Sequence, residues 1–157
     1  MALSFTTIGA TDSTEQIQQF HVTYTQYRTY HEPGMNTTES TTLSIDHTGK
    51  LKVSTKRADH KKRKPKEKKC KESASITKDE LTGFINKLDS LNIDSLQENY
   101  MGDRISDLTI TEKLVIEIEK MKKEITFEGV DAEIPAALSS IIFFLGEMRK
   151  KYLKKCE

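Results

Sequence analysis

The spacing of hydrophobic residues predicts three strands in the first third of the chain. Between Phe20 and about Tyr30, apolar and polar residues alternate, and β-branched and aromatic residues are in excess. Residues 42–45 and 51–54 repeat this alternation on either side of the turn sequence DHTG, in which Gly49 can adopt a positive φ. Because a period of two places successive side chains on opposite faces, each strand should have one buried and one solvated face.

A helical spacing of hydrophobic residues follows, and then a second pair of strands. Thr77 and Glu80 match the capping box that begins many helices, and the apolar residues after them fall on one helical face. The period returns to two over residues 108–118, with Glu112 at an apolar position, where we expect a bulge or bend. Ile125 begins a returning strand, so these residues predict a second hairpin.

The C-terminal segment predicts a second helix. Pro135 stands where a helix can start, because the first turn does not need the N–H that proline lacks. An apolar stripe runs from Leu138 to Tyr152, and basic residues gather at the C-terminal end, where they offset the helix dipole. Phe144 lies off this stripe and Phe143 on its border. These two side chains either pack between the sheet and the neighbouring helix, which we favour, or form a candidate partner surface.

Together these elements predict an α+β fold in a single domain. The expected order is β-β-β-α-β-β-α, with an antiparallel sheet of about five strands. Both helices should lie on the same face of the sheet. Strands that alternate apolar and polar residues have one solvent-exposed face and one apolar face, and the helices must cover the apolar face. We expect residues 1–19 to form a flexible N-terminal tail and residues 20–155 to form the domain, with a disordered basic insertion at 56–72. A chain of 157 residues has room for one such core rather than two.

The basic insertion concentrates the positive charge of the chain. Lys56 to Lys71 holds ten Lys or Arg and two acids, whereas the whole chain holds 25 and 24, so the remainder has 15 basic and 22 acidic residues. We first interpret the segment as a solvated loop. The alternative is nucleic-acid or anionic-surface binding, although no aromatic residue is interleaved in the segment to stack on bases. The candidate anion-binding residues are Lys61, Lys62, Arg63, Lys64, Lys66, Lys68 and Lys69.

No set of residues points to catalysis. Cys70 and Cys156 form no CxxC pair and lack a nearby histidine, so we expect two free, exposed thiols. The histidines lack metal-ligand spacing, and the sequence has no phosphate loop, nucleophile elbow or dinucleotide fingerprint. We therefore expect no enzyme activity, no cofactor and no metal site. The absence of a secretory signal pattern and of a long apolar run favours a cytoplasmic protein with no membrane span.

Several segments together resemble emfourin-type small domains and related prokaryotic α+β domains. The resemblance runs from Phe20 to Lys151, through LSIDHTGKLKV, ITKDELTGFINKLDSLNIDSLQENY, SDLTITEKLVIEI and EIPAALSSIIFFLGEM. It rests on a shared layout of early strands, a helix with a T-x-x-E-L start, an acidic residue before a strand hairpin, and a last helix that begins at proline. Emfourin-like proteins inhibit thermolysin-type metalloproteases, so the resemblance implies a protein-binding module. It carries over no inhibitory residue.

These observations lead to two functional hypotheses. The first is a non-catalytic protein-binding domain, similar to a protease inhibitor, whose partner is another protein. The second is nucleic-acid or anionic-surface binding through Lys56 to Lys71. The first predicts binding that survives deletion of the basic segment and moderate salt, and the second predicts loss of binding under both. We expect a monomer or a weak homodimer.

Overall fold

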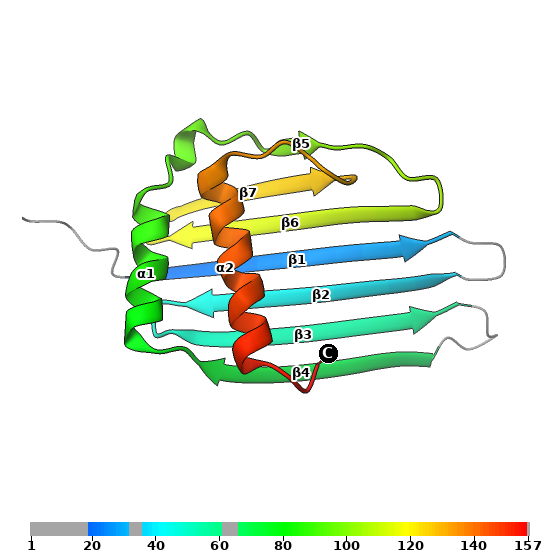
Figure 1. Ribbon diagram of the computed structural model, residues 1–157, viewed down its shortest axis with the longest axis horizontal. Helices are drawn as coiled ribbons and strands as arrows, with labels where there is room; N and C mark the ends of the chain where they lie inside the picture. The colour runs from blue at the N-terminus through cyan, green and yellow to red at the C-terminus, as the bar shows by residue number, and fades with distance from the viewer. Residues whose placement is uncertain (1–18, 32–35, 61–65, 157) are drawn as a thin grey trace, which may run out of the picture.

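The computed structural model is one seven-stranded sheet with two helices on one of its faces (Figure 1). It describes residues 19–31, 36–60 and 66–156, so the predicted tail lies almost wholly outside the described residues. The elements are β1 (Phe20–Tyr30), β2 (Thr37–Asp46), β3 (Lys50–Asp59), β4 (Lys66–Ser75), α1 (Lys78–Asp89), the 3₁₀ helix η1 (Ile93–Ser95), β5 (Asn99–Met101), β6 (Leu108–Ile118), β7 (Met121–Glu128) and α2 (Ala136–Tyr152). The strand order in the sheet is β4-β3-β2-β1-β6-β7-β5.

The sheet differs from the predicted one in size, pairing and order. Seven strands replace about five, the pairing of β5 with β7 is parallel, and four strands precede α1. The fourth strand is the basic segment, because β4 pairs with β3 without interruption from Lys50 opposite Ser75 to Asp59 opposite Lys66. The prediction of a disordered insertion at 56–72 is therefore wrong for the residues in these strands, and residues 61–65 lie outside the described residues.

The hydrophobic pattern did not predict β4 and β5, and each omission has a physical reason. β4 lies at the edge of the sheet, where lysine side chains remain hydrated and also discourage pairing with another chain. β5 has only three residues, which is too short to show a period of two. It is held by its neighbours instead: the N–H of Thr126 donates to the carbonyl of Glu98 at 2.8 Å, and that of Gly102 donates to the carbonyl of Glu128 at 2.7 Å.

The core lies between the two helices and the part of the sheet that they cross (Figure 1). Phe144 of α2 stacks on Phe84 of α1 with ring centroids 4.8 Å apart, so it belongs to the packing between the helices. Phe143 is 68% exposed and remains a candidate partner residue. The fully buried side chains come from both layers: Val22, Ile45, Leu51, Leu114, Ile116 and Ile125 from the sheet, Phe84, Leu88, Leu138, Ile141 and Leu145 from the helices, and Leu153 directly after α2.

The predicted capping box at the start of α1 is confirmed and also binds the end of α2. The N–H of Thr77 donates to the Glu80 carboxylate at 2.9 Å, and the N–H of Glu80 donates to the Thr77 hydroxyl at 3.3 Å. Lys151 and Tyr152 donate to the same carboxylate at 2.6 and 2.7 Å. Partial burial raises the pKa of Glu80, but the hydrogen bonds from Lys151, Tyr152 and Thr77 outweigh it and lower that pKa to about 2.

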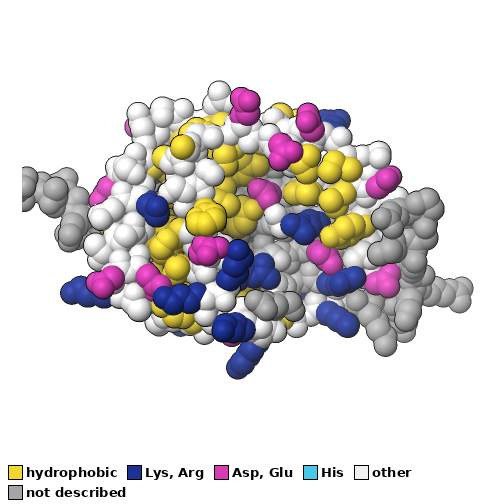
Figure 2. Space-filling view, in the orientation of Figure 1, with side chains coloured by type: hydrophobic (Ala, Val, Ile, Leu, Met, Phe, Trp, Pro, Cys, Tyr) yellow, Lys and Arg dark blue, Asp and Glu magenta, His cyan; other side chains and the backbone are white. Residues whose placement is uncertain are grey.

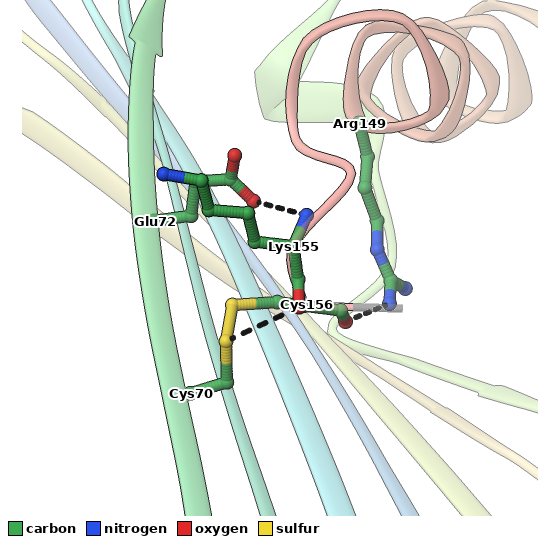
Figure 3. The surroundings of a disulfide bond; sticks show 5 residues. All are labelled: Cys70, Glu72, Arg149, Lys155 and Cys156. Atoms are coloured by element: carbon green, nitrogen blue, oxygen red, sulfur yellow. Dashed lines mark hydrogen bonds between the residues drawn. A yellow bond between two sulfur atoms is a disulfide. The ribbon is translucent and has the colours of Figure 1, made fainter.

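A disulfide joins Cys70 of β4 to Cys156 after α2, so the prediction of two free, exposed thiols is wrong (Figure 3). The two Cα atoms are 5.6 Å apart although 86 positions separate the cysteines along the chain. The segment after α2 makes a further contact with β4, because the N–H of Lys155 donates to the Glu72 carboxylate at 2.9 Å. The end of the described chain is therefore fixed on the edge strand.

Candidate functional site

Five lysines of β3 and β4 share the face of the sheet opposite the helices. Lys113 of β6 and Lys122 of β7 point to the same face, but each forms an ion pair with a glutamate. Strand alternation directs Leu51 and Val53 of β3 into the core, so the intervening residues point to the other face. The register between β3 and β4 places the alternate residues of β4 on that same face. We call the resulting surface the lysine face; its lysines are Lys50, Lys52 and Lys56 of β3, and Lys69 and Lys71 of β4.

The charges on the lysine face are largely unbalanced. Lys56 stands directly opposite Lys69, an arrangement of like charges that disfavours strand pairing. Lys69 forms an ion pair with Glu67 at 2.9 Å. Within residues 19–31, 36–60 and 66–156, the other four lysines of this face form no ion pair. The face therefore presents a positive field to solvent that an external anion can neutralise.

Hydroxyl groups lie among these lysines. Cross-strand pairing alternates lysine with serine, so that Lys52 faces Ser73 and Lys71 faces Ser54. A groove of about 490 Å³ runs along this part of the sheet. Its polar lining consists of Thr42, Ser44, Ser54 and Ser73, of Lys50, Lys52 and Lys71, and of Glu72. Glu72 alternates with Lys71 to the helix side, where its carboxylate accepts from the N–H of Lys155. Lysine ammonium groups and hydroxyl groups can both donate hydrogen bonds to the oxygens of a phosphate.

An exposed tyrosine lies in the same row as two of these lysines. The registers of β1, β2, β3 and β4 align Tyr27, Ser40, Lys56 and Lys69 across the sheet. Tyr27 is 49% exposed, and two strand spacings place it roughly 10 Å from Lys56. The basic segment contains no aromatic residue, but the tertiary structure brings one beside it.

The residues predicted to bind anions do not form one surface. Lys61, Lys62, Arg63 and Lys64 lie outside the described residues, and Lys66 is described only in its backbone. Lys69 belongs to the lysine face, whereas Lys68 points to the helix side, because adjacent residues of a strand point to opposite faces. The sequence analysis missed Lys50, Lys52 and Tyr27. Lys52 had a usable signal, since it occupies a polar position of the predicted strand at 51–54, whereas Lys50 lies just before that predicted strand.

No protein-family model matches this chain, and no curated protein sequence matches it either. The resemblance to emfourin-type domains therefore stays a prediction. In the part of the chain that the structure describes, no group of three or more His, Cys, Asp or Glu side chains could hold a metal ion. Neither described helix has the length and apolar character needed to cross a bilayer.

The helices cover only part of the opposite face, which explains the position of Glu112. The prediction of a bulge is wrong, because β6 pairs continuously with β1 and Glu112 stands opposite Gln26. The amide of Gln26 donates to the Glu112 carboxylate at 2.5 Å. Nearby, burial and the negative charge of Glu112 raise the pKa of the Tyr24 hydroxyl. Along β1, polar Gln26 and Arg28 follow the apolar residues of the same face because the strand continues past the helix-covered core (Figure 1).

Basic and hydrophobic side chains occupy different parts of the exposed surface on the helix side of the sheet. Figure 2 shows Lys and Arg side chains gathered on its lower part and hydrophobic side chains on its upper part. Met101, the last residue of β5, and Ile105, in the segment that joins β5 to β6, are both exposed. Arg57 of β3 and Lys68 of β4 occupy opposite positions on the helix side. The protein therefore has two separate basic surfaces, one on each face of the β3–β4 pair.

Proposed function

We propose that the protein binds single-stranded nucleic acid on the lysine face. The observation that carries this proposal is the sharing of one helix-free sheet face by five lysines, several hydroxyls and the exposed Tyr27. Lysine contacts to phosphates supply affinity without sequence preference, and an aromatic ring provides a surface on which a base can stack. Both components are typical of proteins that bind single strands on a sheet.

The geometry favours a single strand over a duplex. Both described helices lie on the other side of the sheet, so neither can enter a major groove from the lysine face (Figure 1). Lys50 and Lys52 are two positions apart, which separates their Cα atoms by about 6.6–6.8 Å along the strand. Their flexible stems can follow an irregular phosphate backbone, whereas a rigid duplex would need a curved surface or an inserted element.

Salt dependence is the first test. Five phosphate contacts to a single strand predict a slope of about −3.5 in log affinity against log salt concentration, and thus a loss of roughly 100-fold between 50 and 200 mM salt. Fluorescence anisotropy of a labelled oligothymidine, titrated with the full chain at several salt concentrations, measures this slope. Absence of binding at the lowest salt concentration would refute the proposal.

Charge reversal on the lysine face is the second test. Lys52→Glu combined with Lys71→Glu should abolish two contacts and weaken binding at low salt by well over tenfold. The matched control is Lys120→Glu combined with Lys154→Glu, which changes the net charge equally at two exposed positions outside the lysine face. Equal loss in both double variants would show that net charge, rather than this face, determines binding. Tyr27→Ala should weaken binding with little change in the salt slope.

Two other kinds of partner, an anionic lipid surface and another protein, are alternatives to nucleic acid. If vesicles containing phosphatidylserine bind the wild type and the oligonucleotide does not, the lysines serve an anionic lipid surface and the proposal fails. The expectation of a protein partner, including a thermolysin-type protease, stays a prediction. Exposed Met101, Ile105 and Phe143 are the apolar side chains that such a partner would cover. Substitution of the lysine face should not affect that interaction.

A further inference from the structure

A second basic site lies on the helix side, in a pocket between α2 and strands β2, β3 and β4. Its volume is about 420 Å³, within the roughly 300–1,000 Å³ typical of small-molecule sites. Arg57 from β3, Lys68 from β4 and Arg149 from α2 all line it, and Glu39 from β2 is the one acid among its lining residues. These charged residues are far apart in sequence, so only the fold brings them together.

The charges in the pocket leave two positive groups available. Arg57 forms an ion pair with Glu39, with 3.3 Å between guanidinium nitrogen and carboxylate oxygen. Lys68 and Arg149 form no ion pair with any residue that the structure describes. A phosphate monoester carries about −1.5 to −2 charge near neutral pH, which matches these two cations better than the single charge of a carboxylate does.

Arg149 lines the pocket, and the segment that the disulfide fixes to β4 holds its side chain in place (Figure 3). Its guanidinium donates to the carbonyl of Cys156 at 3.2 Å, and Cys156 is bonded to Cys70 of β4. A guanidinium has five N–H donors in a planar fork, so donors remain for a bound oxyanion. Thr41 and Thr55, which face each other across β2 and β3, add hydroxyl groups to the lining.

We infer that this pocket binds a small phosphate monoester through Lys68 and Arg149, and that the Cys70–Cys156 disulfide positions Arg149 for that contact. The cavity is larger than a phosphate group, which leaves room for the organic part of the ligand. Lys56 and Lys69 also line this pocket, but strand alternation directs their side chains to the lysine face, so the two sites use different side chains.

Titration of the isotopically labelled full chain with inorganic phosphate at low ionic strength tests the site. Saturable shifts of backbone amide resonances should centre on Thr41, Thr55 and the segment around Cys156. Acetate should bind about tenfold more weakly, since it carries one charge and fewer acceptor atoms. An absence of saturable shifts would overturn the inference, and so would shifts dispersed over all exposed lysines. Equal affinity for acetate would identify a carboxylate site and overturn the choice of phosphate.

Two single substitutions test the named contacts. Arg149→Gln and Lys68→Gln should each weaken phosphate binding by about tenfold, the usual effect of removing one charge-assisted hydrogen-bond donor. Lys120→Gln, which removes a charge far from the pocket, is the matched control and should leave the affinity unchanged. Loss of the same size in all three variants would show non-specific charge attraction and overturn the inference.

The positioning role of the disulfide needs a separate variant. Replacement of both cysteines by serine should weaken phosphate binding by about fivefold or more while Lys68 and Arg149 are retained, because Arg149 loses its fixed acceptor. The amide spectrum of this variant shows whether the sheet remains folded. Unchanged affinity in a folded variant would overturn the positioning role. Arg149→Gln should not alter oligonucleotide binding, and Lys52→Glu with Lys71→Glu should not alter phosphate binding, so the two proposals fail independently.

Discussion

The Cys70–Cys156 disulfide should supply a large part of the stability of this protein. It closes a loop of 86 positions and holds the end of the described chain on the edge strand. The chain-entropy relation gives about 4.6 kcal/mol for a loop of that length, and native disulfides in small domains contribute about 2–5 kcal/mol when measured. We expect the combined Cys70→Ser and Cys156→Ser variant to lose about 2–4 kcal/mol of its free energy of unfolding.

Urea unfolding followed by circular dichroism measures this loss. The double serine variant is compared with the wild type under oxidising conditions, and both are then measured again with a reductant. Reductant should bring the wild type close to the variant and should leave the variant unchanged. Hydrogen exchange gives a local readout, because amides of β4 should lose protection before those of β1 at the centre of the sheet. A difference below about 0.5 kcal/mol, the size of an ordinary surface substitution, would refute the reasoning.

Other predictions concern the core, the α1 cap and the exposed aromatic residue. Leu114→Ala should cost about 2–5 kcal/mol in urea unfolding, because the side chain is fully buried; a loss below about 1 kcal/mol would contradict its assigned place in the core. The pKa of Glu80 in the folded protein is about 2, against an ordinary value of 4.5, so its carboxylate stabilises the protein above pH 4.5 and this contribution disappears as the pH falls toward 2. Glu80→Gln should therefore flatten the decline in stability over that pH range, and an unchanged pH profile would exclude the effect. Phe143→Ser should change stability by less than about 0.5 kcal/mol, whereas Phe144→Ser should cost several times more, as measured in the same assay. The emfourin-type resemblance predicts inhibition of thermolysin in a peptide-cleavage assay; full protease activity at saturating protein would reject that prediction.

The sequence predicted those elements whose signals are local. The capping box of Thr77 and Glu80 marks the start of α1 because its hydrogen bonds join residues three positions apart. The hairpin of β2 and β3 is similarly local, with Gly49 at φ +76° in its turn. Glu112 was misread because alternation was assumed to mean burial along the whole strand. The strand continues beyond the helices, where a polar residue on the same face needs no bulge.

The sequence by itself therefore determined the period of each long element, the position of the α1 cap and the concentration of positive charge before α1. Only the tertiary structure decided to which face of the sheet each of these basic side chains points. Pairing of β3 with β4 directs Lys69 to the lysine face and Lys68 to the helix side, and it brings Cys70 to Cys156. The physical reason is that side-chain alternation is set by the backbone of a single strand, whereas strand order and register depend on hydrogen bonds between distant segments. A window of sequence around the basic segment does not contain Tyr27 or Arg149, the residues that complete its two candidate sites.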